Sequence, residues 1–230
     1  MQGCGARPGV KYVETFICST LAGGEMLPEE AADAAWTLGY NAVFVATREG
    51  VRCLKGINSK CKVFLRFNLE GENLEEMRRC LGRIRGKVDV VAAPCLSREI
   101  GSWAARNPDV DILYFPDVNF YRILDGTLVR LAYEGRTILE LSLRPLFKLK
   151  GGKRVRAMTM LRRAAGVLVD KSAPFAITCE PRGRYELKAP RGVIAVARLL
   201  GIPPEISVKA ISTYPFLVLE WRGYEGVWKM

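Results

Sequence analysis

Seven short apolar runs, separated by stretches with helical character, constrain the fold more than any other feature of this chain. Each run is rich in β-branched or aromatic residues and has the length of a buried strand. The runs cover residues 12–18, 42–46, 63–67, 88–92, 112–115, 138–142 and 175–178. The sequence therefore predicts seven buried strands that alternate with helices.

The stretches between the runs carry signals for helix starts and stops. Pro28 marks a first turn and Gly39 follows the end of that helix, Asn73 precedes a second helix, and Asp117 precedes a segment that ends near Gly135. Strands that alternate with helices imply a parallel sheet, either a barrel or an open doubly wound sheet. The absence of a Pro/Gly/Ser-rich linker favours an α/β fold, a single TIM-barrel-like (β/α) domain over residues 1–230. Residues 1–10 are expected to form a flexible N-terminal arm.

Positive charge is concentrated in the C-terminal part of the chain. The protein has 35 Lys and Arg residues against 24 Asp and Glu, and residues 137–230 hold 17 of these basic residues but only 7 of the acidic ones. The stretch from Arg144 to Arg163 contains eight basic residues and no acidic one. Such a segment indicates a site for phosphate groups rather than a general means of solubility.

Two helices are predicted within the basic region. In a helix over about residues 153–169, Val155, Met158, Leu161, Ala165 and Leu168 fall on one face, and Lys153, Arg156 and Arg163 fall on the opposite one. A second helix follows Pro190 and stops at Gly201. Its body is nearly all apolar, so we expect it to be mostly buried, with a basic edge at Arg191 and Arg198.

The basic residues predict a binding surface for a polyanion. They follow the sixth and seventh strands or lie in the next helices, and in a β/α barrel the loops after neighbouring strands lie side by side. A single basic helix usually has only a solvated face. Here three basic segments are expected on the same surface: residues 144–163, residues 171–188 and the turn at Arg191. The residues predicted to bind this polyanion, with RNA as the candidate, are Arg144, Lys148, Lys150, Lys153, Arg154, Arg156, Arg163, Lys171, Arg182, Arg184, Lys188 and Arg191. Tyr185 and Tyr214 are candidates for stacking on bases, although we expect either ring to be buried.

Candidates for catalysis are few. The chain has no histidine, the commonest general acid/base and metal ligand. Asp117 and Glu180 are the acids placed just after a strand, and neither a dinucleotide-binding glycine motif nor a Walker-type motif is present. We therefore predict no catalytic residue, metal site or bound cofactor. The alternative is a metal-dependent barrel phosphoesterase that uses Asp117 and Glu180, with Arg144 holding a small phosphorylated substrate.

Composition also bears on the compartment. No window of 18 apolar residues occurs and no apolar signal region begins the chain, which predicts a cytoplasmic protein without a membrane span. Binding to a membrane surface is disfavoured because no amphipathic anchor is present. The seven cysteines lack a C-x-x-C pair, so we expect buried or idle thiols instead of a zinc site or a disulfide framework.

The C-terminal third resembles one known family. The segments ILELSLRPLF (138–147), PFAIT (174–178), YELKAPRGVIAVARLLGIP (185–203) and KAISTYPFLVLEW (209–221) have the order and spacing of ribonuclease P protein component 3, the archaeal-type subunit related to the eukaryotic 30-kDa protein. The resemblance implies a TIM-barrel-like fold and a place in the ribonucleoprotein that removes 5′ leaders from precursor tRNA. It also implies that the RNA and its magnesium perform the cleavage.

The resemblance further implies partners and contacts. Proteins of this family bind a small ferredoxin-like subunit, and the pair stabilises the catalytic domain of the ribonuclease P RNA. The S-L-R-P and A-P-R-G motifs place Arg144 and Arg191 where the family carries a basic residue, which makes them the first candidates for RNA contact. The sequence departs from the family pattern at Cys179, Glu180 and Pro181, so contacts made by that loop are not implied.

Overall fold

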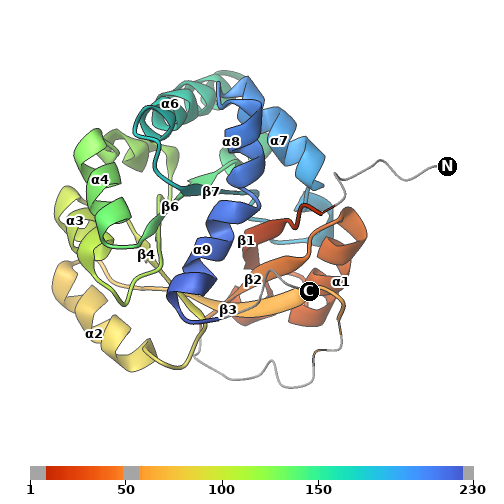
Figure 1. The fold of residues 1–230 in the computed structure, drawn as a ribbon, viewed down its shortest axis with the longest axis horizontal. Helices are drawn as coiled ribbons and strands as arrows, with labels where there is room; N and C mark the ends of the chain where they lie inside the picture. The colour runs from red at the N-terminus through yellow and green to blue at the C-terminus, as the bar shows by residue number, and fades with distance from the viewer. Residues whose placement is uncertain (1–8, 49–56, 58, 225–230) are drawn as a thin grey trace.

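The computed structural model describes residues 9–48, 57 and 59–224, and in them seven parallel strands form a nearly closed barrel surrounded by helices (Figure 1). The strands pair in chain order from β1 to β7. They are β1 (Val13–Cys18), β2 (Ala42–Thr47), β3 (Lys62–Asn68), β4 (Val90–Pro94), β5 (Ile112–Tyr114), β6 (Ile138–Ser142) and β7 (Phe175–Thr178). The predicted TIM-barrel-like α/β class is confirmed, and each predicted run overlaps one strand, with β4 ending two residues beyond its run. The predicted arm falls almost wholly outside the described residues.

Helices follow most of the strands and cover the outside of the barrel. The α-helices are α1 (Pro28–Leu38), α2 (Leu74–Ile84), α3 (Arg98–Arg106), α4 (Gly126–Glu134), α5 (Arg144–Lys148), α6 (Gly151–Asp170), α7 (Pro190–Leu199), α8 (Pro204–Lys209) and α9 (Thr213–Trp221). Three short 3-10 helices are η1 (Thr20–Ala22), η2 (Val118–Ile123) and η3 (Arg184–Glu186). In α1, Pro28 occupies the first turn and Gly39 ends the helix with φ of 98°, as predicted.

The segment after Asp117 differs from its prediction. Asp117 caps only η2, by accepting a 2.9 Å hydrogen bond from the backbone N–H of Asn119. A separate helix, α4, begins eight residues later, because Asp125 accepts a hydrogen bond from the backbone N–H of Leu128 at 2.9 Å. The expected single helix from Asp117 to Gly135 is therefore wrong, and two local caps divide it.

Two predictions of helix burial also need correction. In α6, Leu161, Ala165 and Leu168 are buried as predicted, but Val155 is 66% exposed because the first six residues of the helix have no core beneath them. In α7 only Pro190, Val193 and Ala197 are buried, so the expectation of a mostly buried helix is wrong. Its other apolar side chains are partly or fully exposed.

The inside of the barrel is closed at one end by an apolar layer. Phe216, Val218 and Leu219 of α9 pack against residues at the beginnings of the strands, among them Val13, Ile112 and Ile138. Figure 1 shows α9 lying across this end.

The five cysteines of the described residues are free and buried, as expected (Cys18, Cys61, Cys80, Cys95 and Cys179). Cys4 and Cys53 lie outside the described residues.

The barrel has a seam, the line where the edge strands β1 and β7 meet without a hydrogen-bonded ladder in the described residues. Near it, the backbone N–H groups of Ile177 and Val13 donate to the carbonyl oxygens of Ala210 and Ile211, at 3.0 and 2.9 Å. Glu14 bridges the seam directly: its carboxyl group accepts a hydrogen bond from the Thr178 hydroxyl and one from the backbone N–H of Cys179 at 3.3 Å. One buried side chain thus joins the first strand to the last.

Burial in the barrel raises the pKa of Glu14 to about 8, with a smaller contribution from the nearby Glu140. The unfolded chain releases this proton near pH 4.5, while the folded protein keeps it until about pH 8. The free energy of unfolding should therefore fall between pH 4.5 and pH 8, by up to about 1.4 kcal/mol per pH unit, from this group alone.

We predict that Glu14→Gln removes this part of the pH dependence, since an amide does not ionise. Urea unfolding of the wild type and the variant at pH 5 and pH 8 measures the difference. Glu205→Gln, at an exposed position of α8, is the control and should keep the wild-type slope. Equal pH dependence in Glu14→Gln and the wild type would contradict the assignment.

Candidate nucleic-acid interface

Several predicted cations meet at the carboxyl ends of β6 and β7. Arg144 opens α5 directly after β6, and Lys148 ends that helix. Lys188 comes from the loop between β7 and α7. These three side chains line one hollow of about 390 Å³, the rim hollow, together with Glu25, Phe147, Cys179, Gly183, Tyr185 and Glu186. The sequence therefore predicted correctly that the sixth and seventh strand ends bring basic residues together.

Glu186 neutralises two of the cations in the rim hollow. Its carboxylate pairs with Arg144 at 2.7 Å and also accepts a hydrogen bond from Lys148. Arg144 donates a second bond to the backbone oxygen of Glu180 at 2.8 Å, and its side chain is only 21% exposed. Partial burial opposes ionisation of Glu186, but hydrogen bonds from Lys148, the Arg182 backbone and Arg144 lower its pKa to about 2. The sequence analysis missed this acid, which lies 42 residues from Arg144 along the chain.

Lys188 and Tyr185 lie at the exposed edge of the rim hollow. The Lys188 amino group donates to the backbone oxygen of Tyr185 at 2.9 Å and lies 5.7 Å from the centre of the Phe147 ring. Tyr185 is 93% exposed, so the expectation of a buried ring is wrong for this residue. Tyr214 is half-buried, with its ring 6.3 Å from that of Phe175, as expected of an aromatic at the edge of the core.

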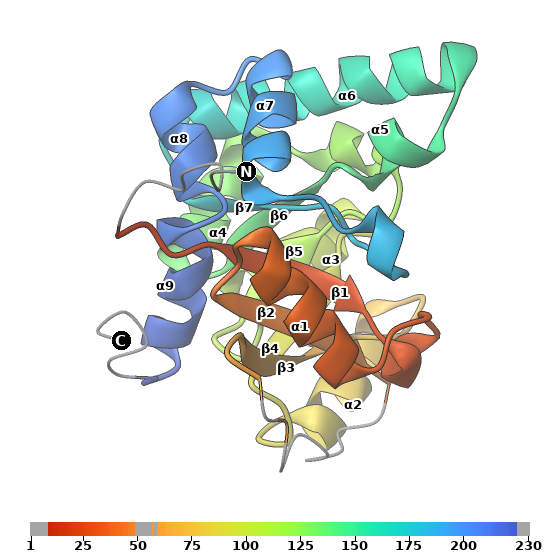
Figure 2. The same ribbon diagram turned by 90° about the vertical axis from the view of Figure 1, so that its right-hand side faces the viewer.

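A second group of predicted cations lies on the projecting start of α6. Residues 151–156 are all exposed, and Figure 2 shows α5 and the first turns of α6 extending beyond the strand ends. We call residues 151–156 the α6 projection. It carries Lys153, Arg154 and Arg156, of which Arg154 donates a 2.6 Å hydrogen bond to the backbone oxygen of Leu149. Within the part of the chain that the structure describes, Lys153 and Arg156 have no ion-pair partner.

The remaining predicted residues are more scattered. Lys150 is exposed just before α6, Arg163 is exposed further along it, and Arg191 is exposed in the first turn of α7. Arg182 is exposed beside the rim hollow. Arg184 instead lines a groove with the acidic residues Glu25, Glu30 and Asp33 near α1.

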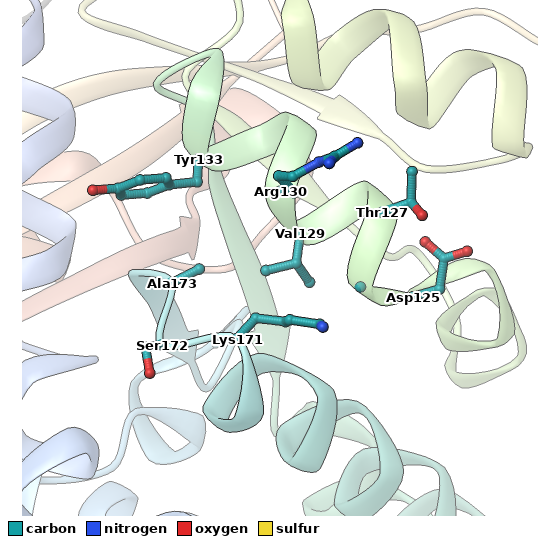
Figure 3. Close-up of a pocket in the computed structure, with 9 residues that line it drawn as sticks. Asp125, Thr127, Val129, Arg130, Tyr133, Lys171, Ser172 and Ala173 are labelled. Atoms are coloured by element: carbon teal, nitrogen blue, oxygen red, sulfur yellow. The ribbon is translucent and has the colours of Figure 1, made fainter.

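Lys171 is separated from the predicted continuous surface. It caps the C-terminal end of α6, a helix of 20 residues and therefore about 30 Å long. It lies beside α4, at a hollow lined by Asp125, Gly126 and Tyr133 (Figure 3). The expectation that Lys171 joins the other cations is wrong, because a helix end and the loop after a strand point to different parts of a β/α barrel.

A buried polar cluster fills the barrel interior, and the sequence analysis did not identify it. Arg66 donates to Glu140 and to the backbone oxygen of Thr15, both at 2.7 Å, and its Nε donates to Asn68 at 2.8 Å. The guanidinium lies 4.1 Å from the centre of the Phe16 ring. The signal that could have revealed the cluster is the presence of Glu14, Arg66 and Glu140 inside otherwise apolar strands.

Asp117 and Glu180, the acids of the alternative enzyme hypothesis, both have structural roles. Asp117 is exposed and caps η2. Glu180 accepts a 3.0 Å hydrogen bond from the Ser142 hydroxyl, and burial raises its pKa. Among the described residues, no group of three or more Cys, Asp or Glu side chains is arranged to hold a metal ion.

Comparison with known proteins identifies the family. The family model of RNase P subunit p30 matches residues 27–225. The chain belongs to this family. Ribonuclease P protein component 3 of Methanosarcina mazei is 24% identical over 213 residues, which are 89% of this chain and 87% of that protein. The component 3 of Methanococcus maripaludis is 28% identical over 170 residues, 74% of this chain and 73% of its own length.

Solved structures agree on the fold of this p30-family chain. A chain in the cryo-EM structure of archaeal ribonuclease P with mature tRNA matches with a TM-score of 0.75 and 20% identity, over 92% of this chain and 91% of that one. Ochratoxinase of A. niger matches with a TM-score of 0.61 and 10% identity, over 91% and 71%. Both likenesses show the barrel fold alone, and the family assignment rests on the family model.

In residues 9–48, 57 and 59–224, no helix combines the length and apolar character that a membrane span requires.

We predict that Glu186→Gln increases the affinity for duplex RNA, because it frees the charges of Arg144 and Lys148. The slope of log Kd against log salt concentration should steepen by about one to two units. Fluorescence anisotropy over a salt series measures the slope, and Glu205→Gln is the control that removes the same charge elsewhere. An equal change in both variants would show a general charge effect and contradict a role for Glu186 at this surface.

Proposed function

We propose that this chain acts as an RNA-binding protein subunit of ribonuclease P, the ribonucleoprotein endonuclease that removes 5′ leaders from precursor tRNA. Membership of the RNase P subunit p30 family carries the proposal. In this account the ribonuclease P RNA and its magnesium perform the cleavage, and the protein binds no cofactor of its own. The cytoplasm is the compartment that we expect.

The RNA-binding role rests on the basic surface around the carboxyl ends of β6 and β7. The α6 projection presents three cations within four residues, and residues 144–169 contain no acidic residue. Each phosphate that a cation neutralises releases counterions, so the affinity gained is strongest at low salt. Such contacts position the RNA without reading its sequence, which suits a subunit that stabilises a folded RNA.

The rim hollow and the α6 projection are expected to contribute differently to the affinity for RNA. Arg144 is held by Glu186 and by the Glu180 backbone, so a phosphate must compete with an existing ion pair there. Lys153 and Arg156 have no such competitor among the described residues, and both are exposed. We therefore assign the larger share of RNA binding to the α6 projection, and Arg144 stays a predicted contact of lower weight.

A protein partner completes the proposal. The family resemblance supports a ferredoxin-like ribonuclease P subunit as the partner, with the pair binding the catalytic domain of the RNA. The cryo-EM structure that shares this fold is described as archaeal ribonuclease P with mature tRNA, which supports RNA and tRNA as further partners.

We predict that the double variant Lys153→Ala/Arg156→Ala weakens binding to ribonuclease P RNA and lowers the salt slope by about two units. Its stimulation of precursor-tRNA cleavage should fall in parallel when the particle is reconstituted near physiological salt. Arg78→Ala/Arg83→Ala is the matched control, because it removes the same charge from exposed positions of α2, on another side of the barrel (Figure 1). Equal losses in the two variants would contradict the assigned surface.

A further inference from the structure

A second hollow lies apart from the basic surface, between α4 and the turn after α6 (Figure 3). We call it the side hollow. Its volume of about 660 Å³ lies in the range of small-ligand sites. It is lined by Asp125, Gly126, Thr127, Val129, Arg130, Tyr133, Lys171, Ser172 and Ala173.

Lys171 forms a positively charged part of this hollow. Its side chain packs against Gly126, where an added Cβ atom would come within 2.4 Å of the Lys171 Cε atom. Figure 3 shows its amino group directed toward Asp125 and Thr127. Within the described residues, this amino group has neither a hydrogen bond nor an ion pair. Glycine at position 126 thus leaves space for an unpaired ammonium group along the first turn of α4.

Arg130 adds a second cation, and the one acid of the hollow is already engaged. The Arg130 side chain is 70% exposed and pairs with Glu134 only at 3.8 Å. Asp125 accepts hydrogen bonds from the Leu128 backbone and from Arg98. Burial raises the pKa of Asp125, but these hydrogen bonds hold it below its ordinary value. The side hollow therefore presents positive charge that its own carboxylate does not cancel.

Tyr133 supplies an exposed aromatic surface at the other end of the hollow. Its side chain is 60% exposed, so its ring is accessible to a base from solution. Thr127 and Tyr133 are six residues apart, about 9 Å along the helix. An aromatic ring near cations is the arrangement that binds an unpaired nucleotide, by stacking the base and neutralising the phosphate.

We propose that the side hollow binds an unpaired nucleotide of RNA, with the base on Tyr133 and the phosphate at Lys171 and Arg130. The inference rests on the RNA-binding function proposed above and adds a site that is separate from the α6 projection. The two sites are at opposite ends of α6, and Lys153 and Lys171 are 18 residues apart, so bound RNA would contact the protein at two places about 25 Å apart.

Photocrosslinking to the full-length chain tests the proposal. The probe is a single-stranded hexauridylate that contains 4-thiouridine, and the crosslinked peptides are identified by mass spectrometry after trypsin digestion. We expect a crosslink to residues 131–136, which trypsin releases after Arg130 and Arg136. Tyr133→Leu should reduce its yield about fivefold or more at subsaturating probe, because one stacked base contributes about 1 kcal/mol or more.

Two further variants make the test specific. Tyr133→Phe keeps the ring and should retain the wild-type yield, while Lys171→Ala should lower the yield and weaken its dependence on salt. Lys87→Ala is the control for lost charge, at an exposed position before β4, and should have no effect. Thermal unfolding of each variant checks that the fold is kept.

The outcomes separate this inference from the proposed function. Wild-type crosslinks confined to other peptides, or equal yields in Tyr133→Leu and wild type, would overturn the nucleotide site. If ribonuclease P RNA still binds to the same preparation, the proposed function stands without the site. Protection of residues 131–136 by another protein subunit, without any RNA crosslink, would assign the side hollow to a protein partner and also overturn the proposal.

Discussion

The polar bridge across the barrel seam is the interaction on which the other features depend. Among the described residues, β1 and β7 share no hydrogen-bonded ladder, and Glu14 joins them through Thr178 and the Cys179 backbone. Next to this bridge, the Thr15 hydroxyl donates to Glu140 at 2.6 Å, and Glu140 holds Arg66. These contacts connect strands 1, 3, 6 and 7 through the interior, so they fix the position of the strand ends that carry the basic surface.

Burying these charged groups in the barrel interior opposes folding. A buried ion pair must repay the desolvation of both charges, and Arg66 Nη2 has no hydrogen-bond partner among the described residues. The Phe16 and Tyr114 rings, 4.1 and 5.5 Å from the guanidinium, recover part of that cost by cation–π contact. The features suited to binding lie at the rim or on the outside of the barrel: the α6 projection, the rim hollow and the side hollow.

The sequence predicted the fold well, since strands covered on both faces are visible as apolar runs. It could not predict which charges meet. Arg66 and Glu140 are 74 residues apart and Arg144 and Glu186 are 42 apart, so their pairing follows from the closed barrel and not from any local pattern. The error over Lys171 has a similar cause. The sequence shows that Lys171 follows a long helix, but not that this helix places Lys171 far from the other cations. The expected burial of Val155 rests on helical periodicity, which cannot show that α6 extends past the core.

The most direct test of the central claim is precursor-tRNA cleavage by the ribonuclease P RNA and its other protein subunits, with and without this chain, beside the chain alone. All reactions should contain the same magnesium concentration. We predict that cleavage, or its tolerance of low magnesium, rises only when the chain joins the full mixture, and that the chain alone is inactive. Cleavage by the protein alone, or no response of the full mixture to its addition, would contradict it.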